Sequence, residues 1–403
     1  MRFPEFSGEW KKVKVSKLLD FYSANSLSWE QLDYNNGKIK NLHYGLIHKG
    51  VPTMVDVSSV SLPYIKEETM PKSYTLFKEG DVAFADASED TNDVAKAIEV
   101  INCDSQQIVS GLHTIHGRDN SNQTVIGYKG YAFASDSFHK QIRRIAQGTK
   151  VFSISVRNFD EVYIGIPSKK EQTKIAKLLI AIDERIATQN KIIEKLQSLI
   201  KGLPHRIAKL GLQNTSWEKT LLANVLTERK ELNTELHSVF SVSVSEGVIN
   251  QIEYLGRSFA AKDTSNYHVA HYGDIIYTKS PTGDFPYGII KQSHIESNVA
   301  ISPLYGVYIP ISFEIGVYLH YYFMSAVSAN NYLYSLVQKG AKNTINISNQ
   351  RFLENRVPVP IIRSKIRNSA KALIAIQKKL SLEKKTLASL IAQKNHLLQQ
   401  MFI

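Results

Sequence analysis

The most regular hydrophobic pattern in the chain runs from Ile175 to Leu210. Apolar residues recur here in alternating steps of four and three, at Ile175, Leu179, Ile182, Ile186, Ile193, Leu196, Ile200, Leu203, Ile207 and Leu210. A 3.5-residue repeat kept over about five heptads puts these side chains on one narrow stripe, which suits pairing with a second helix. Gln189 occupies one position of this seam, where a polar residue commonly fixes the register of the pair.

A second stretch near the C-terminus follows the same alternation. It begins at Ile366 and carries Leu373, Ile376, Leu380, Leu387, Leu390, Leu397 and Met401, with Ser369, Glu383 and Lys394 as polar interruptions. Two matched seams in one chain pair most simply with each other. We therefore expect an intramolecular antiparallel coiled coil.

The ends of the central helix can be read from local residues. Pro167 stops the preceding strand, and Ser168 with Glu171 forms a capping box that predicts a helix start. Pro204 cannot donate to the carbonyl of Ile200, so a kink or a short break is expected there. Gly211 supplies a stop after Leu210.

The remaining sequence alternates short β-rich runs with Gly, Asn and Asp, which is typical of mixed globular domains. In the first of them a helix is expected over 133–147 and strands over 151–156 and 161–166. The predicted fold is α+β, with two mixed α/β domains separated by the two long helices. The expected bounds are a first domain over 1–167, a central helix over 168–211, a second domain over 212–360 and a C-terminal helix over 361–403.

The chain also resembles itself at an offset of about 193 residues. Ile154-Ser155, Phe159 and Pro167 match Ile347-Ser348, Phe352 and Pro360 at 193, and Gly148-x-Lys150 matches Gly340-x-Lys342 at 192. Trp10 matches Trp217 at 207, while Ser198-Leu199-Ile200 and His205 match Ser389-Leu390-Ile391 and His396 at 191. Each half is thus predicted to be a globular domain followed by a helix.

This organisation has a geometric consequence. If the helices pair antiparallel, a pseudo-twofold axis relates the two domains, and the backbones of duplex DNA have the same symmetry. The stretch from Ile175 to Leu210 spans about 54 Å at about 1.5 Å per residue, more than one duplex turn of about 34 Å. Because the two domains differ in sequence, two half-sites read by them should differ as well.

Composition narrows the class of protein. The chain has 403 residues, 43% of them hydrophobic, which suffices for two or more packed domains. No apolar run is long enough to span a membrane and the N-terminus lacks an apolar signal core, so a cytoplasmic protein is expected. The single Cys103 excludes an intrachain disulfide.

The net charge of +12 favours a polyanionic partner. For DNA contacts we expect loop residues, because amides and guanidinium groups pair with base edges while ammonium and hydroxyl groups hold phosphates. An ordinary solvated loop remains the alternative for each of them. The candidates are Asp86, Ser88, Thr91, His113, Arg118 and Lys150 in the first domain, and Thr278, Lys279, Ser280, Thr282, Lys339, Lys342 and Asn343 in the second.

Motifs for catalysis are few. No Asn-Pro-Pro-Tyr, G-x-G-x-x-G or Walker A motif occurs, so neither a cofactor nor a nucleotide is expected to bind this chain. The triplets Glu9-Trp10-Lys11 and Glu228-Arg229-Lys230 lack an upstream acidic partner that a metal-dependent nuclease needs. His113-x-x-His116 and His268-x-x-His271 lack a third zinc ligand, so structural or DNA-facing roles are expected.

Several motifs resemble one known family, the specificity (S) subunit of type I restriction-modification systems. The segment Arg2-Phe3-Pro4-Glu5-Phe6 resembles the start of that family's first target recognition domain. The segments 80–90, 111–114 and 273–280 are similar to parts of such domains. Most specific is the junction Ile164-Gly165-Ile166-Pro167 followed by Glu171-Gln172-x-x-Ile175-Ala176 and Asp183. The second half lacks both the Arg-Phe-Pro-Glu-Phe start and the Glu-Gln pair.

The resemblance implies a non-catalytic role. Each domain would read one half of a bipartite double-stranded DNA sequence, while the paired helices act as a spacer and dock two methyltransferase (M) subunits. Restriction (R) subunits would join that core. S-adenosylmethionine, ATP and magnesium would be used by these partner subunits. The alternatives that the residues leave open are a self-contained DNA-modifying or DNA-cleaving enzyme, and a coiled-coil scaffold without a DNA role.

Overall fold

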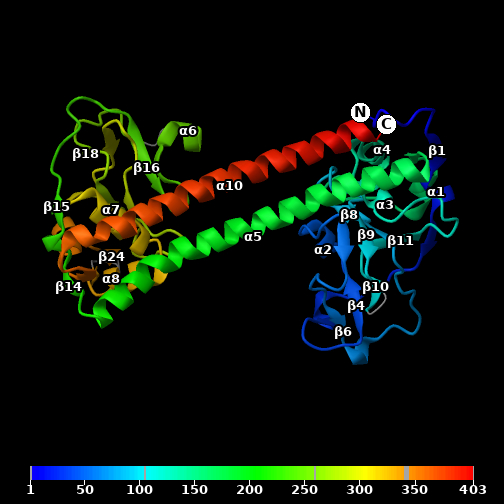
Figure 1. Ribbon diagram of the computed structural model, residues 1–403, viewed down its shortest axis with the longest axis horizontal. Coiled ribbons are helices and arrows are strands. Elements are labelled where there is room, and N and C mark those ends of the chain that lie inside the picture. Colours follow the sequence, from blue (N-terminus) through cyan, green and yellow to red (C-terminus); the bar gives the residue numbers. More distant parts are fainter. Residues whose placement is uncertain (1, 104–105, 258–259, 340–344, 403) are drawn as a thin grey trace. The chain divides into compact units, whose positions relative to one another are not determined.

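Two long helices, α5 (Lys169–Gln213) and α10 (Ile366–Met401), organise the computed structural model (Figure 1). The structure describes residues 2–103, 106–257, 260–339 and 345–402. The chain divides into two compact units, one formed by Met1–Asn190 with Thr386–Ile403 and the other by Lys191–Lys385. Each helix therefore contributes one part to each unit. None of the helices in the described ranges combines the length and hydrophobicity that crossing a membrane requires.

The first unit is built around a five-stranded sheet. Its strand order is β2 (Asp20–Tyr22), β11 (Thr114–Arg118), β7 (Val82–Ala85), β9 (Ala97–Ile101) and β5 (Met54–Asp56). Alternate side chains of β7 point to opposite faces. Val82 and Phe84 join the core under α3 (Tyr128–Phe133) and α4 (Asp136–Ile145). Ala83 and Ala85 join a second core with α2 (Tyr44–His48).

Smaller sheets complete the first unit. A four-stranded sheet has the order β10 (Gln107–Ser110), β4 (Ile39–Leu42), β6 (Tyr64–Ile65) and β3 (Leu32–Asp33). Two antiparallel pairs join β1 (Lys11–Lys14) to β13 (Tyr163–Ile166) and β8 (Ala87–Ser88) to β12 (Phe152–Ser153). The short helical segments are α1 (Val15–Leu18), η1 (Trp29–Gln31), η2 (Glu67–Thr69) and η3 (Val156–Asp160).

The second unit contains two four-stranded sheets. One has the order β15 (Leu226–Glu228), β22 (Gly306–Pro310), β19 (Ile275–Tyr277) and β20 (Ile290–Gln292), and the other β17 (Gly247–Asn250), β16 (Val239–Ser243), β21 (Val299–Ile301) and β18 (His268–Ala270). Strand pairs join β14 (Trp217–Leu221) to β25 (Arg356–Pro360) and β23 (Gln338–Lys339) to β24 (Ile345–Asn346). The helical segments are α6 (Gln251–Leu255), α7 (Phe313–Tyr322), α8 (Ala326–Tyr334), α9 (Asn349–Phe352), η4 (Leu222–Asn224) and η6 (Arg363–Lys365).

The internal repeat recurs in the strand registers of the two units. Lys11 pairs with Ile166 in the first unit, and Glu218 pairs with Val359 in the second, which are the positions 207 and 193 residues further on. The other matched positions also agree. Phe159 and Phe352 are both fully buried, and Ser155 and Ser348 both precede a short helical segment.

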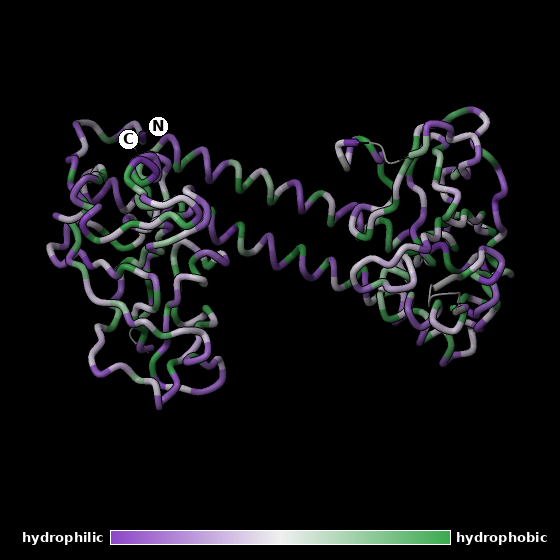
Figure 2. Tube along the Cα trace, turned by 180° about the vertical axis from the view of Figure 1, so that it is seen from behind, coloured by the Kyte–Doolittle hydropathy of each residue, from purple (hydrophilic) through white to green (hydrophobic). Residues whose placement is uncertain are grey.

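Both long helices contribute side chains to a common region of each unit. In the first, Ile175 and Leu179 of α5 share a core with Leu397 and Met401 of α10, so the start of one helix lies beside the end of the other. In the second, Ile200 of α5 and Leu380 of α10 line one cavity. The predicted seam positions up to Ile200 in α5 and up to Leu397 in α10 are buried or half-buried, namely Ile175, Leu179, Ile182, Ile186, Gln189, Ile193, Leu196, Ile200, Leu373, Ile376, Leu380, Glu383, Leu387, Leu390 and Leu397. In Figure 2 hydrophobic and hydrophilic positions alternate along both helices.

Three predictions about α5 need correction. The predicted break at Pro204 is wrong, because the helix is continuous through this residue. The helix also ends two residues beyond the predicted limit, at Gln213. Leu210 is exposed, and the buried stripe passes instead through Pro204, Ala208 and Gly211, which face the second domain.

The third correction concerns the start of α5. The Ser168 hydroxyl accepts from the amide of Glu171 at 3.3 Å, as a helix cap requires. However, the carboxylate of Glu171 binds Arg2 and Trp10, so the reciprocal half of the predicted capping box is used elsewhere. The helix expected over 133–147 is also two helices, α3 and α4, because Ser135 caps a new start by accepting from Phe138.

Candidate nucleic-acid interface

The Glu-Gln pair at the start of α5 is a structural anchor. Glu171 is 1% exposed, and its two carboxylate oxygens accept from Nε and a terminal nitrogen of Arg2, each at 2.7 Å. Trp10 donates its indole N–H to the same carboxylate at 3.3 Å. A bidentate contact of this kind fixes both distance and orientation. The N-terminal segment is thereby attached to the long helix.

Gln172 attaches two further segments to the same helix turn. Its side-chain oxygen accepts from the amide of Val125 at 2.9 Å, and its nitrogen donates to the carbonyls of Gln123 and Pro167. Because this amide is fully buried, its hydrogen bonds are needed to offset the cost of desolvation. The Glu-Gln pair therefore positions the domain on the helix, and neither side chain is exposed for a ligand.

A Gly-Asp turn recurs in both domains. Asp81 accepts from the backbone amide of Lys78 and Asp274 from that of His271, each three residues earlier. Each carboxylate also binds an arginine, Arg118 for Asp81 and Arg229 for Asp274. The two aspartates are 193 residues apart, so they are a further matched pair of the internal repeat.

These contacts bear on the candidate Arg118. Its guanidinium binds Asp81 at 2.6 Å, donates to the carbonyl of Leu76 and lies 4.8 Å from the ring centre of Tyr22. Burial acts to raise the pKa of Asp81, but hydrogen bonds from His116 and Arg118 outweigh it and hold the pKa below its usual value. The contacts of Arg118 thus have a structural explanation, and nothing in this geometry favours the predicted role in binding DNA.

Asp86, Ser88 and His113 lie together on the first unit. Nδ1 of His113 is 3.0 Å from a carboxylate oxygen of Asp86, and half of the His113 side chain is exposed. Burial raises the pKa of Asp86, while the nearby His113 acts in the opposite direction. Ser88 follows in β8, its hydroxyl accepting from the amide of Asp90, and Thr91 is half-buried in the next turn.

A row of aromatic rings adjoins this group. Ring centres are 4.3 Å apart for Trp29 and His43, 4.8 Å for His43 and Tyr44, and 5.2 Å for Tyr44 and His113. Trp29 is 40% exposed, and the ammonium of Lys49 lies 5.5 Å from its ring centre. Sequence reasoning missed these residues because they come from separate segments with no common spacing. His43 is buried within the row, whereas the exposed ring of Trp29 beside a cation and polar groups can stack on a base and adjoin a phosphate.

The strand pairings that flank the two Gly-x-Lys segments are equivalent. Gln147 forms a β-bridge with Ser153 in the first unit, and Lys339 pairs with Ile345 in the second. Each residue of the second pair lies 192 positions after its counterpart in the first. The turn in the first unit carries Lys150, which is exposed. Gly148 has a φ of +141° and a Cβ there would overlap the carbonyl of Val151, so the turn needs glycine. In the second unit Lys339 lies in β23, while the candidates Lys342 and Asn343 fall outside the described residues.

The remaining candidates of the second domain divide into buried and exposed groups. Thr278 is 2% exposed and its hydroxyl accepts from the amide of Ile289, which is a structural role. Burial lowers the pKa of Lys279, with Glu228 acting in the opposite direction. Ser280 and Thr282 are exposed, on the loop that follows. The DNA-binding roles of all these candidates stay predictions.

The two histidines of the first pair bind different carboxylates. His116 is fully buried and donates to Asp81 at 2.7 Å, whereas the His113 side chain points to Asp86. Over the described parts of the chain, no group of three or more His, Cys, Asp or Glu residues could hold a metal ion. Glu228, from one of the two Glu-x-Lys triplets, accepts from the side chain of Asn349 at 2.7 Å.

Comparisons with known proteins agree with this architecture. Residues 7–198 match the family described as the Type I restriction modification DNA specificity domain. The whole chain is similar to the crystal structure of a type I restriction-modification system S subunit from M. genitalium. That match has 16% sequence identity and a TM-score of 0.58, and it covers 100% of this chain and 99% of that one.

A second solved structure, which concerns the complex assembly and conformational transition of the type I R-M system, also matches. It has 14% identity and a TM-score of 0.50, and the match covers 98% of this chain and 97% of that one. No curated protein sequence matches the chain. At these identities the solved structures establish a shared fold, and the family assignment comes from the sequence of the first half. Residues 7–198 of this chain thus match the family of the type I restriction modification DNA specificity domain, and the chain as a whole shares the fold of the solved S subunit.

Proposed function

We propose that the chain is the DNA sequence-specificity subunit of a type I restriction-modification complex. Each globular domain reads one half of an asymmetric, bipartite site in double-stranded DNA. The chain itself carries out no chemistry. It supplies the DNA sequence specificity for two methyltransferase subunits and for the restriction subunits that join them. The complex acts in the cytoplasm.

The observation that carries this proposal is the repeated domain with a changed surface. Both halves share the strand register around Trp10 and Trp217, the buried Phe159 and Phe352, and the Gly-Asp turn. The exposed residues differ between the two halves. The first half carries the aromatic row that ends at His113, and the second carries a polar loop with Ser280 and Thr282. Two equivalent domains with different surfaces suit two different half-sites.

The long helices are proposed as a spacer and as a dock for the methyltransferases. Their buried seams, with apolar residues from both helices in each unit, support a stable pair. S-adenosylmethionine, ATP and magnesium belong to the partner subunits under this proposal. The net charge of +12 favours association with DNA without choosing the sequence.

The experiment that tests this proposal uses the full chain with and without its methyltransferase. The purified chain with DNA, magnesium and S-adenosylmethionine should neither cut nor methylate. Addition of the methyltransferase should give adenine methylation at a two-part sequence. Exchange of residues 1–167 for the same region of a family member should change one half of that sequence and leave the other half intact.

Two results would contradict the proposal. Cleavage by the isolated chain that is lost on mutation of Glu9 or Glu228 would favour a self-contained enzyme. Methylation of an unchanged sequence after the domain exchange would show that specificity resides elsewhere.

A further inference from the structure

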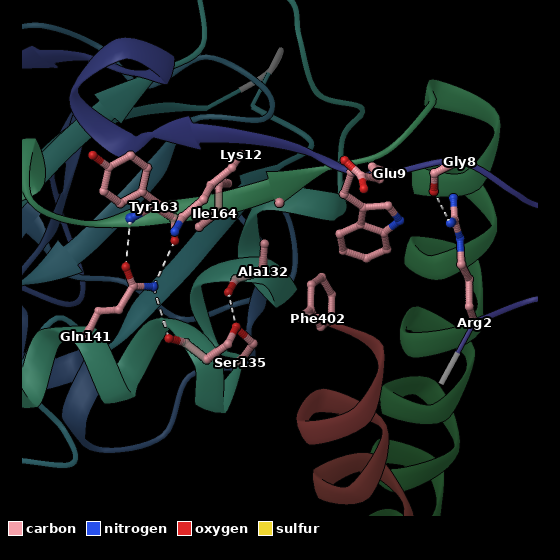
Figure 3. A pocket seen from close by; sticks show the side chains of 13 residues that line it. Arg2, Gly8, Glu9, Lys12, Ala132, Ser135, Gln141, Tyr163, Ile164 and Phe402 are labelled. Atoms are coloured by element: carbon pink, nitrogen blue, oxygen red, sulfur yellow. Dashed lines mark hydrogen bonds between the residues drawn. The ribbon is translucent and has the colours of Figure 1, made fainter.

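Each unit contains a cleft where its globular domain meets the end of a long helix. The first, of about 530 Å³, is lined by β1, β13, α3, α4 and Phe402, which follows α10 (Figure 3). The second, of about 560 Å³, is lined by β14, β25, α7, α8 and the last part of α5.

The two clefts occupy equivalent places in the internal repeat. Lys12 pairs with Gly165 across the strands of the first, and Lys219 pairs with Pro358 across those of the second. Ser135 begins α4 as its cap and Ser325 begins α8 in the same way, 190 residues apart. The strand pairs and the two serine caps align the two clefts residue by residue. In this alignment five lining positions of one cleft match lining positions of the other: Lys12 and Lys219, Tyr163 and Arg356, Gly165 and Pro358, Ala132 and Tyr322, and Gln141 and Asn331.

Both clefts combine an apolar floor with a lysine at the rim, and Glu9 also lines the first cleft. In the first the floor includes Trp10 and Phe402, whose rings meet edge to face at 6.4 Å, and the ammonium of Lys12 lies 4.8 Å from the ring centre of Tyr163. Figure 3 shows Gln141 reaching across to the strand, where it accepts from the amide of Tyr163 and donates to its carbonyl.

The second cleft has the more basic rim. Ala208, Leu212 and Tyr322 supply apolar surface, while Lys209 and Lys219 supply charge. A lysine at the same position is therefore common to both clefts, and no aspartate or glutamate lines the second among the described residues.

We propose that the two clefts are equivalent docking sites for the same segment of the methyltransferase subunit, one copy in each cleft. The segment presents an apolar side chain to the floor and a carboxylate to Lys12 or Lys219. This inference rests on the proposed function and adds the surface at which the partner binds. The equivalence of the two clefts supports this inference, since two copies of one partner need two similar surfaces on a single chain.

A protein segment fits these clefts better than DNA does. Recessed pockets of this volume with aromatic or aliphatic walls suit a side-chain anchor, which is how protein interfaces concentrate their binding energy. DNA backbones are held mainly by cations and polar groups, and here the floor is apolar. Charge reversal at one exposed lysine should weaken docking at its own cleft by at least tenfold, because it sets like charges against each other.

The test measures how many methyltransferase subunits bind the full chain. In native mass spectrometry without DNA, the unaltered chain should bind two copies. Lys12→Glu and Lys219→Glu should each reduce this to one copy at the same protein concentrations, and the double variant should bind none. The matched controls are Lys11→Glu, whose side chain points to the opposite face of β1, and Lys230→Glu outside both clefts. Both controls should keep two copies.

A photo-crosslinking amino acid at position 12 or 219 supplies a readout that does not depend on affinity. Crosslinks from both positions to the same methyltransferase peptide would support the proposal. Two bound copies in the double variant, crosslinks to unrelated peptides, or loss of DNA affinity with methyltransferase binding unchanged would overturn it. If the unaltered chain binds no methyltransferase at all, the proposed function itself fails.

Discussion

Lys394 of α10 and Asp183 of α5 form an ion pair in the first unit, with 2.6 Å between ammonium and carboxylate. The carboxylate also accepts from the hydroxyl of Tyr131 on α3 at 2.8 Å. Asp183 thus links both long helices to the globular domain. The two side chains are about one-fifth exposed, so screening by solvent is limited.

This relationship predicts the effect of Asp183→Asn. Removing the charge leaves Lys394 without its counter-ion and weakens the bond from Tyr131, which should destabilise the first unit by about 1–3 kcal/mol. Thermal unfolding by circular dichroism measures the change. The neighbouring Glu184→Gln is the control, because Glu184 is exposed, and its variant should unfold at the same temperature as the unaltered chain.

Replacement of two glycines of α5 by alanine should change the free energy of unfolding in opposite directions. A Cβ on Gly202 would meet nothing within 4 Å, so Gly202→Ala should stabilise the helix by about 0.5–1 kcal/mol through its higher helix propensity. A Cβ on Gly211 would overlap the indole of Trp217, so Gly211→Ala should destabilise by about 1–3 kcal/mol. Urea unfolding of both variants measures the difference. Equal shifts for the two variants would contradict the packing described for the end of this helix.

The same end of α5 shows where sequence reasoning reaches its limit. The heptad pattern predicts Leu203, Ile207 and Leu210 in the seam, but the buried stripe shifts because Trp217, beyond the helix, packs onto Gly211. Likewise Glu171 has the sequence of a capping box, yet it binds Arg2 across 169 residues. Long-range contacts override local rules at these positions, and periodicity carries no information about them.

The repeat was more predictable than the candidate site. Apolar spacing and matched motifs are properties of sequence, and they identified the two long helices and the duplicated domain. Surface chemistry depends on which loops meet. Residue type makes Arg118 and Thr278 candidates, but in the folded chain Arg118 binds Asp81 and Thr278 accepts from the amide of Ile289. The row from Trp29 to His113 comes from separate segments, and only the folded chain brings it together.

Buried Lys291 predicts a pH dependence of the second unit. Its burial lowers the pKa to about 8 from an ordinary value of 10.5. Between these two values the unfolded chain holds a proton that the folded chain has released, so the contribution of Lys291 to stability should rise with pH. Its charge should cost about 3 kcal/mol at pH 7, before the hydrogen bond to the carbonyl of Val244 is considered.

The variant Lys291→Met isolates this effect. The free energy of unfolding of the unaltered chain, relative to that of the variant, should increase from pH 8 to pH 10 in urea titrations. Lys201→Met, which removes an exposed lysine from the neighbouring part of α5, should show no such slope. A flat difference for Lys291→Met would show that the ammonium is solvated in the folded chain.

The first-domain candidates predict effects confined to one half-site. His113→Ala should relax base discrimination in one half by about 1–3 kcal/mol, the range for a lost base contact, and leave the other half unchanged. Ser280→Ala with Thr282→Ala should do the reverse. Competition binding of the methyltransferase complex to a library of singly altered sites measures both. Changes spread evenly over both halves would remove these residues from base reading.

Lys150 is expected to contact phosphate. Lys150→Ala should weaken all sequences about equally and reduce the slope of log affinity against log salt concentration by about 1. Fluorescence anisotropy at several salt concentrations gives this slope. An unchanged slope would indicate that Lys150 makes no phosphate contact.

The central claim is that one chain reads two different half-sites through two equivalent domains. Genome-wide methylation mapping tests it most directly, in cells that carry the chain with its methyltransferase and in cells from which only the chain is deleted. We predict that deletion removes a single adenine-methylated motif made of two unlike parts with a fixed spacing. Retention of that motif without the chain, or loss of a motif with no second part, would contradict the account.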